Sequence, residues 1–283
     1  MLRLRENEDY LMAETTQIEW TDRTFNPWTG CTKISPGCDN CYAEGWSKRS
    51  GHVKWGNHPR KRTTEAYWKA PLAWQRDAEA FELKNGRRQR VFCASLADVF
   101  DNKIDPAWRA DLFELIRATP GLDWQLLTKR PQNMAKMLPS DWGDKGWANV
   151  WLGFTAEDQV RFDQRKRFLD EIPAVVWFVS YEPAIGSLRI AGIDPVPNWL
   201  IIGGESGPNA RPLRPEWVHG ILEDCKTRSI APFFKQWGQY ENNPLTGQLN
   251  LAKSDMKGID PHGKGGGLVN GAIVRSFPEG DAA

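Results

Sequence analysis

The chain has 283 residues, of which 40% are hydrophobic and 26% are charged, and its formal net charge is +1. This composition is that of a globular protein with one large α/β domain or two smaller domains. The near-neutral charge excludes a global electrostatic attraction to nucleic acid or membranes, and no apolar run reaches the roughly eighteen residues of a membrane span.

The N-terminal segment, which we expect to form an extension over residues 1–17, lacks the apolar core of a signal peptide. Three of the five cysteines, Cys31, Cys38 and Cys41, lie in one short motif. An odd number of cysteines without an export signal favours a reducing compartment over a disulfide framework. We therefore expect a cytoplasmic protein that does not associate with membranes.

A basic insertion is expected near residues 47–90, after the cysteine motif. Its positive charges alternate with Trp55, Tyr67 and Trp68, a pattern typical of sites that bind phosphate groups or stack unpaired bases. A solvated surface insertion explains the pattern equally well. The basic residues concerned are Lys48, Arg49, Lys54, Arg60, Lys61, Arg62 and Lys69.

Residues 18–238 are expected to form the main domain, because short apolar runs there alternate with segments of helical periodicity. The runs have the continuous hydrophobicity of strands buried on both faces. Repeated strand–helix units predict an α/β fold, a complete or partial (β/α) barrel of parallel strands, with a doubly wound sheet as the alternative. The expected strands lie within residues 90–100, 124–131, 149–158, 175–186, 199–208 and 231–238, with one more before the cysteine motif.

Each expected strand ends in polar residues. The carboxyl ends of parallel strands form the active-site face of (β/α) barrels, so these residues predict one shared polar pocket. Helix capping is the alternative for some of them, in particular Asp98 and Thr155. The strand-end residues are Ser95, Asp98, Thr128, Lys129, Arg130, Thr155, Glu157, Ser180, Glu182, Glu205, Ser206, Lys235 and Gln236.

The periodicity fades after residue 238. Residues 239–283 are rich in glycine and polar side chains, and we expect them to form a peripheral C-terminal tail. The sequence does not decide whether this tail closes over the pocket or lies apart from it.

The cysteine motif predicts a metal site. A structural zinc ion would need a fourth protein ligand, such as His52 or His58. Three cysteines alone suit a [4Fe-4S] cluster that leaves one iron open to a small molecule. S-adenosylmethionine binds to an open iron of this kind when it is cleaved to a radical.

Several ordered motifs resemble a known family. They are "WTGCTKISPGCDNCYAE", "SLADVF", "LLTKRP", "SYEP", "GGESGPNARP" and "FKQWG". Together they resemble the phage- and prophage-associated three-cysteine-motif family with radical-SAM-like features, from Ile18 to Gly238. The radical-SAM superfamily usually has three residues between its first two cysteines and an aromatic residue before the third. Here six residues separate Cys31 from Cys38, and Asn40 precedes Cys41.

The resemblance implies a partial barrel that holds the cluster on the three cysteines. By position, Ser95 and Asp98 end the second strand, where the superfamily contacts the methionine amino group. Thr155 or Glu157, which end the fourth strand, suit the ribose hydroxyls of the cofactor. The expected substrate end of the pocket consists of Lys129, Arg130, Glu182, Glu205, Arg211 and Gln236, among which we expect Lys129, Glu182, Glu205 and Arg211 to act on substrate.

The sequence "GGE" at Gly203, Gly204 and Glu205 matches a superfamily motif that belongs on the second strand, but here it lies on about the sixth. In this place the glycines would let a ligand approach the backbone closely. Glu205 and Arg211 would then face substrate, or they form a simple ion pair.

The leading hypothesis is a radical S-adenosylmethionine enzyme that uses a [4Fe-4S] cluster to generate a 5′-deoxyadenosyl radical. The phage-like family suggests a nucleic acid or nucleotide substrate, in modification or repair, and the chemistry requires an electron-donor protein. The sequence leaves the need for a further partner protein open. The alternatives are a zinc-stabilised nucleic-acid-binding protein without catalysis, and a barrel that has lost activity and serves as a scaffold.

Overall fold

The computed structural model describes residues 16–278, and most of the expected extension 1–17 lies outside them. Seven parallel strands form one sheet in which spatial order follows chain order. The strands are β1 (Arg23–Thr24), β4 (Gln89–Cys93), β5 (Leu122–Thr128), β6 (Val150–Thr155), β7 (Val176–Tyr181), β8 (Trp199–Gly203) and β9 (Ala231–Gln236).

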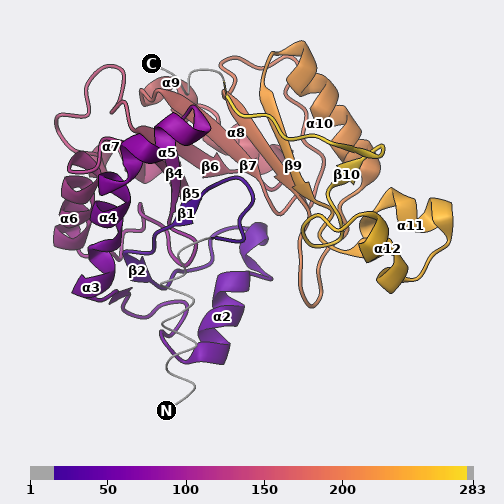
Figure 1. The fold of residues 1–283 in the computed structure, drawn as a ribbon, viewed down its shortest axis with the longest axis horizontal. Coiled ribbons are helices and arrows are strands. Elements are labelled where there is room, and N and C mark those ends of the chain that lie inside the picture. Colours follow the sequence, from indigo (N-terminus) through magenta and orange to yellow (C-terminus); the bar gives the residue numbers. More distant parts are fainter. Residues whose placement is uncertain (1–15, 279–283) are drawn as a thin grey trace.

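The sheet curls into a partial barrel (Figure 1). A doubly wound sheet would reverse its direction of growth at an inner strand, whereas every strand here is added on the same side of the preceding one. Within the described residues β1 and β9 are not paired, so the barrel stays open between them. The prediction of an α/β fold with a complete or partial barrel of parallel strands is therefore confirmed, and the barrel is the partial one.

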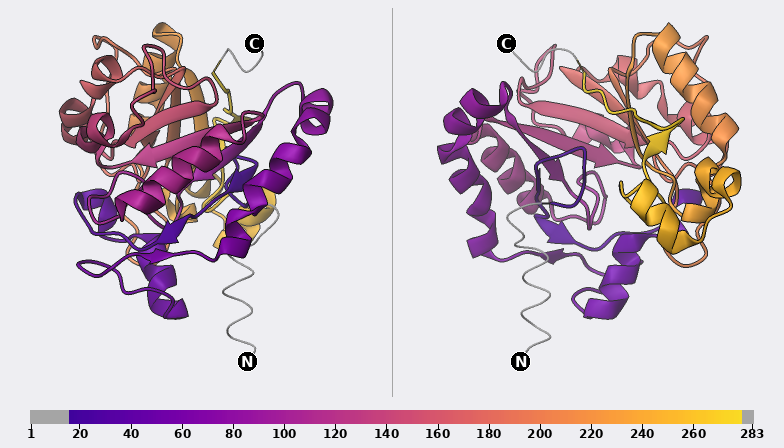
Figure 2. Two further views of the ribbon diagram at one scale, coloured as in Figure 1. Left: turned by 90° about the vertical axis from the view of Figure 1, so that its left-hand side faces the viewer. Right: turned by 45° about the vertical axis from the view of Figure 1, so that its right-hand side comes forward.

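Most helices cover the outer face of the sheet, while α2 stands apart from them (Figures 1 and 2). The longer helices have clear start signals. α6 begins with Pro106 in its first turn, and the Asp105 carboxylate accepts a hydrogen bond from Ala107 N. The helices are α2 (Tyr42–Ser50), α3 (Glu65–Trp68), α4 (Ala70–Arg76), α5 (Ala78–Asn85), α6 (Pro106–Arg117), α7 (Met134–Met137), α8 (Gln159–Arg165), α9 (Phe168–Glu171) and α10 (Pro215–Thr227).

The two faces of the sheet carry two different cores. Side chains alternate along each strand, so Leu126 and Phe154 pack outward against the helices. The inner face holds an aromatic cluster that includes Phe92, Trp151 and Trp199. This cluster fills the inside of the barrel below the carboxyl ends of the strands.

The open side of the barrel is bridged by the two ends of the described chain. Glu19 and Arg275 form an ion pair of 2.9 Å, and the Phe277 ring packs against Trp199. Backbone hydrogen bonds attach the tail to β9, from Phe234 N to the carbonyl of Val274. The tail, seen beside β9 in Figure 2, contains α11 (Pro244–Leu249), α12 (Lys253–Ile259), β10 (Leu268–Val269) and β11 (Ala272–Ile273).

A small antiparallel pair links the cysteine motif to the basic insertion, since β2 (Trp28–Thr29) pairs with β3 (Lys61–Arg62). None of the helices within residues 16–278 has the length and apolar character needed to cross a membrane.

Candidate functional site

A cavity of about 580 Å³ lies on the inner face, at the carboxyl ends of the strands. The three cysteines of the motif line it together with strand-end residues from β4 to β9. Among the predicted site residues, those that line it are Cys31, Cys38, Cys41, Ser95, Asp98, Lys129, Thr155, Glu182 and Glu205. Glu157 and Arg211 are outside this lining, and Arg130 and Gln236 are part of it. The cavity thus gathers predicted site residues that are distant from one another along the chain.

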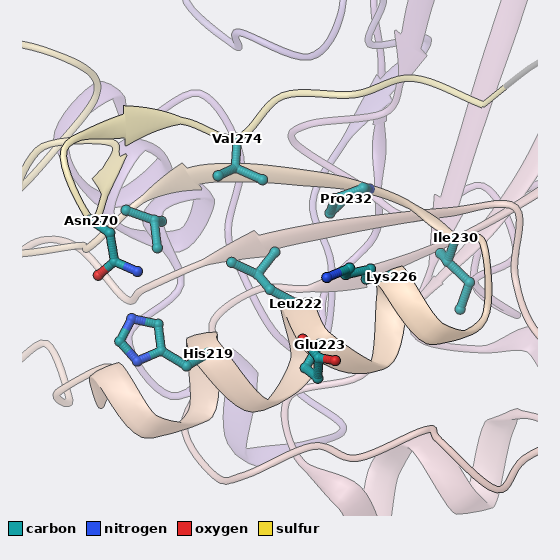
Figure 3. A pocket seen from close by; sticks show the side chains of 9 residues that line it. His219, Leu222, Glu223, Lys226, Ile230, Pro232, Asn270 and Val274 are labelled. Carbon is teal, nitrogen blue, oxygen red and sulfur yellow. The ribbon is translucent and has the colours of Figure 1, made fainter.

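A second cavity of about 610 Å³ lies on the outer side, between α10 and the β10–β11 hairpin (Figure 3). Leu222, Ile230 and Val274 give it an apolar wall, and His219 lies at one end. No cysteine and none of the predicted site residues line it. Despite its similar volume, we place the chemistry at the inner cavity, because only that cavity gathers the thiols and the strand-end groups.

The cysteine motif forms a loop over the strand ends. The short helix η1 (Pro36–Cys38) contains the second cysteine, and the third directly precedes α2. All three thiols are free and partly exposed. Within residues 16–278, no group of three or more His, Cys, Asp or Glu side chains is arranged to hold a single metal ion.

Cys31 contacts a cation. Arg130 Nη1 lies 3.5 Å from Cys31 Sγ, and Arg130 Nη2 donates to the Thr32 carbonyl at 2.9 Å. Burial raises the pKa of the Cys31 thiol to about 11, and the charge of Asp98 adds to this, while Arg130 opposes both. Arg130 therefore favours the thiolate form at this corner of the motif.

Asp98 is committed to contacts within the protein. It is 5% exposed, and its carboxylate accepts hydrogen bonds from the Thr128 hydroxyl at 2.6 Å and Lys129 N at 3.2 Å. It also pairs with Arg130 at 2.8 Å. These partners occupy both carboxylate oxygens, so Asp98 fixes the guanidinium group of Arg130 beside the cysteine motif.

Glu157 supports the cysteine loop from below. It is fully buried, forms an ion pair with Arg165 at 3.0 Å, and accepts a hydrogen bond from the Ser35 hydroxyl. Burial raises its pKa, but the charges of Lys129 and Arg165 and the Ser35 hydrogen bond outweigh burial and leave the pKa lowered. The Glu157 carboxylate is therefore ionised and anchors the loop.

Glu205 and Arg211 hold the same loop from the other side. They form an ion pair of 2.5 Å, and Arg211 Nη2 donates to the Pro36 carbonyl at 2.9 Å. Asn40 Nδ2 donates to Glu205 Oε2 at 2.9 Å. Burial raises the pKa of Glu205, but hydrogen bonds from Arg211 and Asn40 lower it overall. The pair thus clamps the segment that carries Cys38.

Ser95, Thr155 and Lys129 leave more of their hydrogen-bonding capacity open to the cavity. Ser95 Oγ exchanges hydrogen bonds with the Asn26 amide at 3.1 and 3.2 Å. Lys129 Nζ donates to Thr155 Oγ1 at 3.2 Å and forms no ion pair within the described residues. All three residues line the cavity.

The substrate end predicted from the sequence gains residues from both ends of the chain. Glu182 forms an ion pair with Lys235 at 3.0 Å, and Lys264 from the tail also lines the cavity. Glu19 and Trp20 line it from the N-terminal side. The glycine-rich run "HGKGGG" around Lys264 was a signal for a tight turn, but nothing in the sequence placed that turn beside β9.

The glycines of "GGE" face protein atoms. A side chain at Gly203 would meet Glu182 Oε1 at 2.5 Å, and one at Gly204 would overlap the Trp237 carbonyl. Close packing against the backbone is thus sufficient to require glycine at Gly204, whereas at Gly203 the nearest atom is the end of the Glu182 side chain.

Three of the seven basic residues singled out in the insertion, Lys48, Arg60 and Arg62, form ion pairs with acidic residues outside it. Arg60 and Asp101 form a buried ion pair of 2.6 Å. Arg62 pairs with Asp111 at 2.6 Å and lies 4.0 Å from the centre of the Trp68 ring. These contacts give the charges structural partners, and a role in nucleic-acid binding stays a prediction.

The two histidines considered as zinc ligands do not line the cavity with the cysteines. His52 packs near Trp46, with ring centres 5.6 Å apart, and His58 is exposed. The described residues therefore provide no fourth ligand of the kind that the zinc alternative requires.

Comparison with known proteins identifies the family of this chain. Residues 15–278 match the family described as "Protein of unknown function (DUF5131)". No curated protein matches the chain. Among solved structures, a mutant of spore photoproduct lyase with bound AdoMet and dinucleoside spore photoproduct is similar, with a TM-score of 0.39 and 13% identity. The match covers 70% of this chain and 59% of the lyase chain. This similarity is too low to indicate an activity.

Proposed function

We propose that this chain, which belongs to the family described as "Protein of unknown function (DUF5131)", is a radical S-adenosylmethionine enzyme. Cys31, Cys38 and Cys41 would hold its [4Fe-4S] cluster. The observation that carries the proposal is the cavity at the carboxyl ends of the strands, which three free thiols and the strand-end polar groups line together.

The donor set fits this cluster. Each cysteine of a three-cysteine site binds a different iron of the cluster, so the sulfurs need not surround one ion. In this protein the three thiols line one cavity and are not arranged around a single metal ion, which is consistent with such a cluster site. Arg130 in addition donates a hydrogen bond to a motif sulfur, as is common around iron–sulfur clusters.

When bound, the cluster supplies the electron for reductive cleavage of S-adenosylmethionine, which yields a 5′-deoxyadenosyl radical. The chain binds and orients the cofactor, with the hydroxyls of Ser95 and Thr155 as its hydrogen-bonding groups. Trp20, Phe92 and Leu127 form an apolar part of the cavity wall, which would shield the reacting centre from water.

Asp98 and Glu157, expected from the sequence to bind the cofactor, act in this proposal through Arg130 and the cysteine loop. Glu205 and Arg211 have the same indirect role, because their contacts hold the loop. Lys129 and Glu182 face substrate, together with Lys235 and Lys264.

Nucleic acid or a nucleotide is the proposed substrate class, in modification or repair, with an electron-donor protein as partner. The resemblance to phage-associated proteins suggests this class. Lys129 and Lys264 support it, since within the described residues neither forms an ion pair, whereas each carboxylate of the cavity lining has a cation within 4.0 Å. The five free cysteines agree with a reducing, cytoplasmic location.

The test is formation of 5′-deoxyadenosine from S-adenosylmethionine by the reconstituted, chemically reduced protein. We expect product from the wild type and none from Cys38→Ala or Cys41→Ala. The matched control is Cys225→Ala, which removes a buried thiol in α10, outside the cavity. Equal product from the control and the motif variants would contradict the proposal, and so would no product from wild-type protein that carries the cluster.

A further inference from the structure

We propose that Arg130, opposed by Asp98, sets the reduction potential of the cluster. This inference rests on the proposed function, because it concerns the group that the three cysteines would hold. It assigns Arg130 as a positioning residue that acts through a cysteine, in place of the substrate contact expected from the sequence.

The geometry fixes the guanidinium group at the cysteine motif. Arg130 is 6% exposed and follows β5. Its Nη1 donates to both Cys31 Sγ, at 3.5 Å, and Asp98 Oδ2, at 2.8 Å, and its Nη2 donates to the Thr32 carbonyl. The backbone N of Arg130 donates to the Thr128 hydroxyl at 2.8 Å. A side chain held by three hydrogen bonds has little freedom to turn toward a substrate.

The arrangement distinguishes one cysteine from the other two. Cys38 Sγ lies 3.7 Å from the neutral Ser35 hydroxyl. In the part of the chain that the structure describes, no other guanidinium or ammonium group lies within hydrogen-bond distance of a motif sulfur. Within the described residues, the cation that hydrogen-bonds to a motif sulfur is therefore at the Cys31 corner of the motif.

Charge at this corner acts directly on reduction. An added electron makes the cluster and its thiolates more negative, so a buried cation that donates to a thiolate sulfur stabilises the reduced form. The carboxylate of Asp98 accepts a hydrogen bond from the same Nη1 at 2.8 Å, and its negative charge disfavours the added electron. Removal of Arg130 and removal of the Asp98 charge must therefore shift the potential in opposite directions.

The experiment is a redox titration, followed by EPR, of reconstituted protein without S-adenosylmethionine. We expect Arg130→Gln to lower the midpoint potential, Arg130→Lys to lower it less, and Asp98→Asn to raise it. Lys136→Gln is the matched control, because it removes an exposed positive charge in α7. Its potential should equal that of the wild type.

Arg130→Gln leaves Asp98 buried without its cation, which can prevent folding. The double variant Arg130→Gln with Asp98→Asn keeps the buried charge balanced, and we expect its potential to lie between those of the two single variants. Opposite shifts support the inference, since a purely structural role would not give them.

Two results would overturn the inference, and they differ. A wild-type protein that takes up no cluster would refute the proposed function and the inference together. A cluster whose potential is the same in the wild type, Asp98→Asn and the double variant would refute the inference alone.

Discussion

Glu157 follows the fourth main-sheet strand of the chain, β6, and its carboxylate contacts Ser35 of the cysteine loop. Its contacts with Arg165 and Ser35 replace the ribose contact that its position in the sequence suggested. The sequence predicted that a carboxylate follows this strand. It did not predict the direction of the side chain, because Glu157 lies two residues beyond the end of β6, where the strict alternation of strand side chains no longer applies.

We predict that Glu157→Gln destabilises the protein by about 3 kcal/mol at pH 7, because it leaves the buried Arg165 without its counterion. The folded-state pKa of Glu157 is lowered from 4.5. Its contribution to stability is therefore present above pH 4.5 and is lost as the pH falls through the lowered value. Urea unfolding of wild type and variant at several pH values should show a difference that shrinks below pH 4.5.

The matched control is Glu171→Gln, which breaks an exposed pair with Arg167 of 3.9 Å. This variant should change stability by less than about 1 kcal/mol, with little dependence on pH. An equally small effect of Glu157→Gln would show that Glu157 does not anchor the loop.

The cysteine loop carries the three predicted metal ligands, and contacts with the rest of the fold hold it in position. Glu157 supports it from below, and the pair of Glu205 and Arg211 holds it from the side. At Gly37 an added Cβ would lie 2.6 Å from Glu157 Oε1. The sequence identified the cysteines of this loop, but its anchors come from the ends of β6 and β8, and such long-range contacts leave no local signal.

We predict that Gly37→Ala displaces the loop and costs about 1–3 kcal/mol, the usual effect of overpacking. The displaced thiols of Cys38 and Cys41 should then react faster with a thiol reagent. Gly45→Ala is the control, because Gly45 lies within α2, where alanine is favoured by up to about 1 kcal/mol over glycine. Unchanged stability and thiol reactivity in Gly37→Ala would refute the close contact.

The glycine-rich turn of the tail is built around Asp260. This fully buried carboxylate accepts hydrogen bonds from Gly267 N at 2.8 Å, Leu268 N at 2.9 Å and Asn243 Nδ2 at 3.0 Å. Gly238 N also donates to the Lys264 carbonyl. These contacts place Lys264 at the cavity, a position that the sequence could not give because it depends on the end of β9.

We predict that Asp260→Ala destabilises the protein by about 2–5 kcal/mol, because several buried donors lose their acceptor at about 1–3 kcal/mol each. Limited proteolysis should cut the turn 262–267 in this variant before the rest of the chain unfolds. Asp255→Ala, in an exposed position of α12, should behave as the wild type. Equal resistance of both variants would show that Asp260 does not hold the turn.

At the scale of the whole molecule, the sequence predicted the parallel sheet and its polar end because both follow from patterns local to each strand. It did not show that the barrel is partial. That depends on how chain segments 17–20 and 263–277 bridge the gap between β1 and β9, through contacts such as Glu19 with Arg275. Nor did it predict that Arg60 and Arg62 of the basic insertion pair with Asp101 and Asp111, since these carboxylates lie outside the insertion.

The central claim is that Cys31, Cys38 and Cys41 hold a [4Fe-4S] cluster at the inner cavity. The most direct measurement is the metal content of protein reconstituted anaerobically with iron and sulfide, together with the EPR spectrum of its reduced form. We predict about four irons per chain, a signal that shifts when S-adenosylmethionine is added, and loss of that signal in Cys38→Ala. One zinc ion per chain, with no spectral response to S-adenosylmethionine, would contradict the claim.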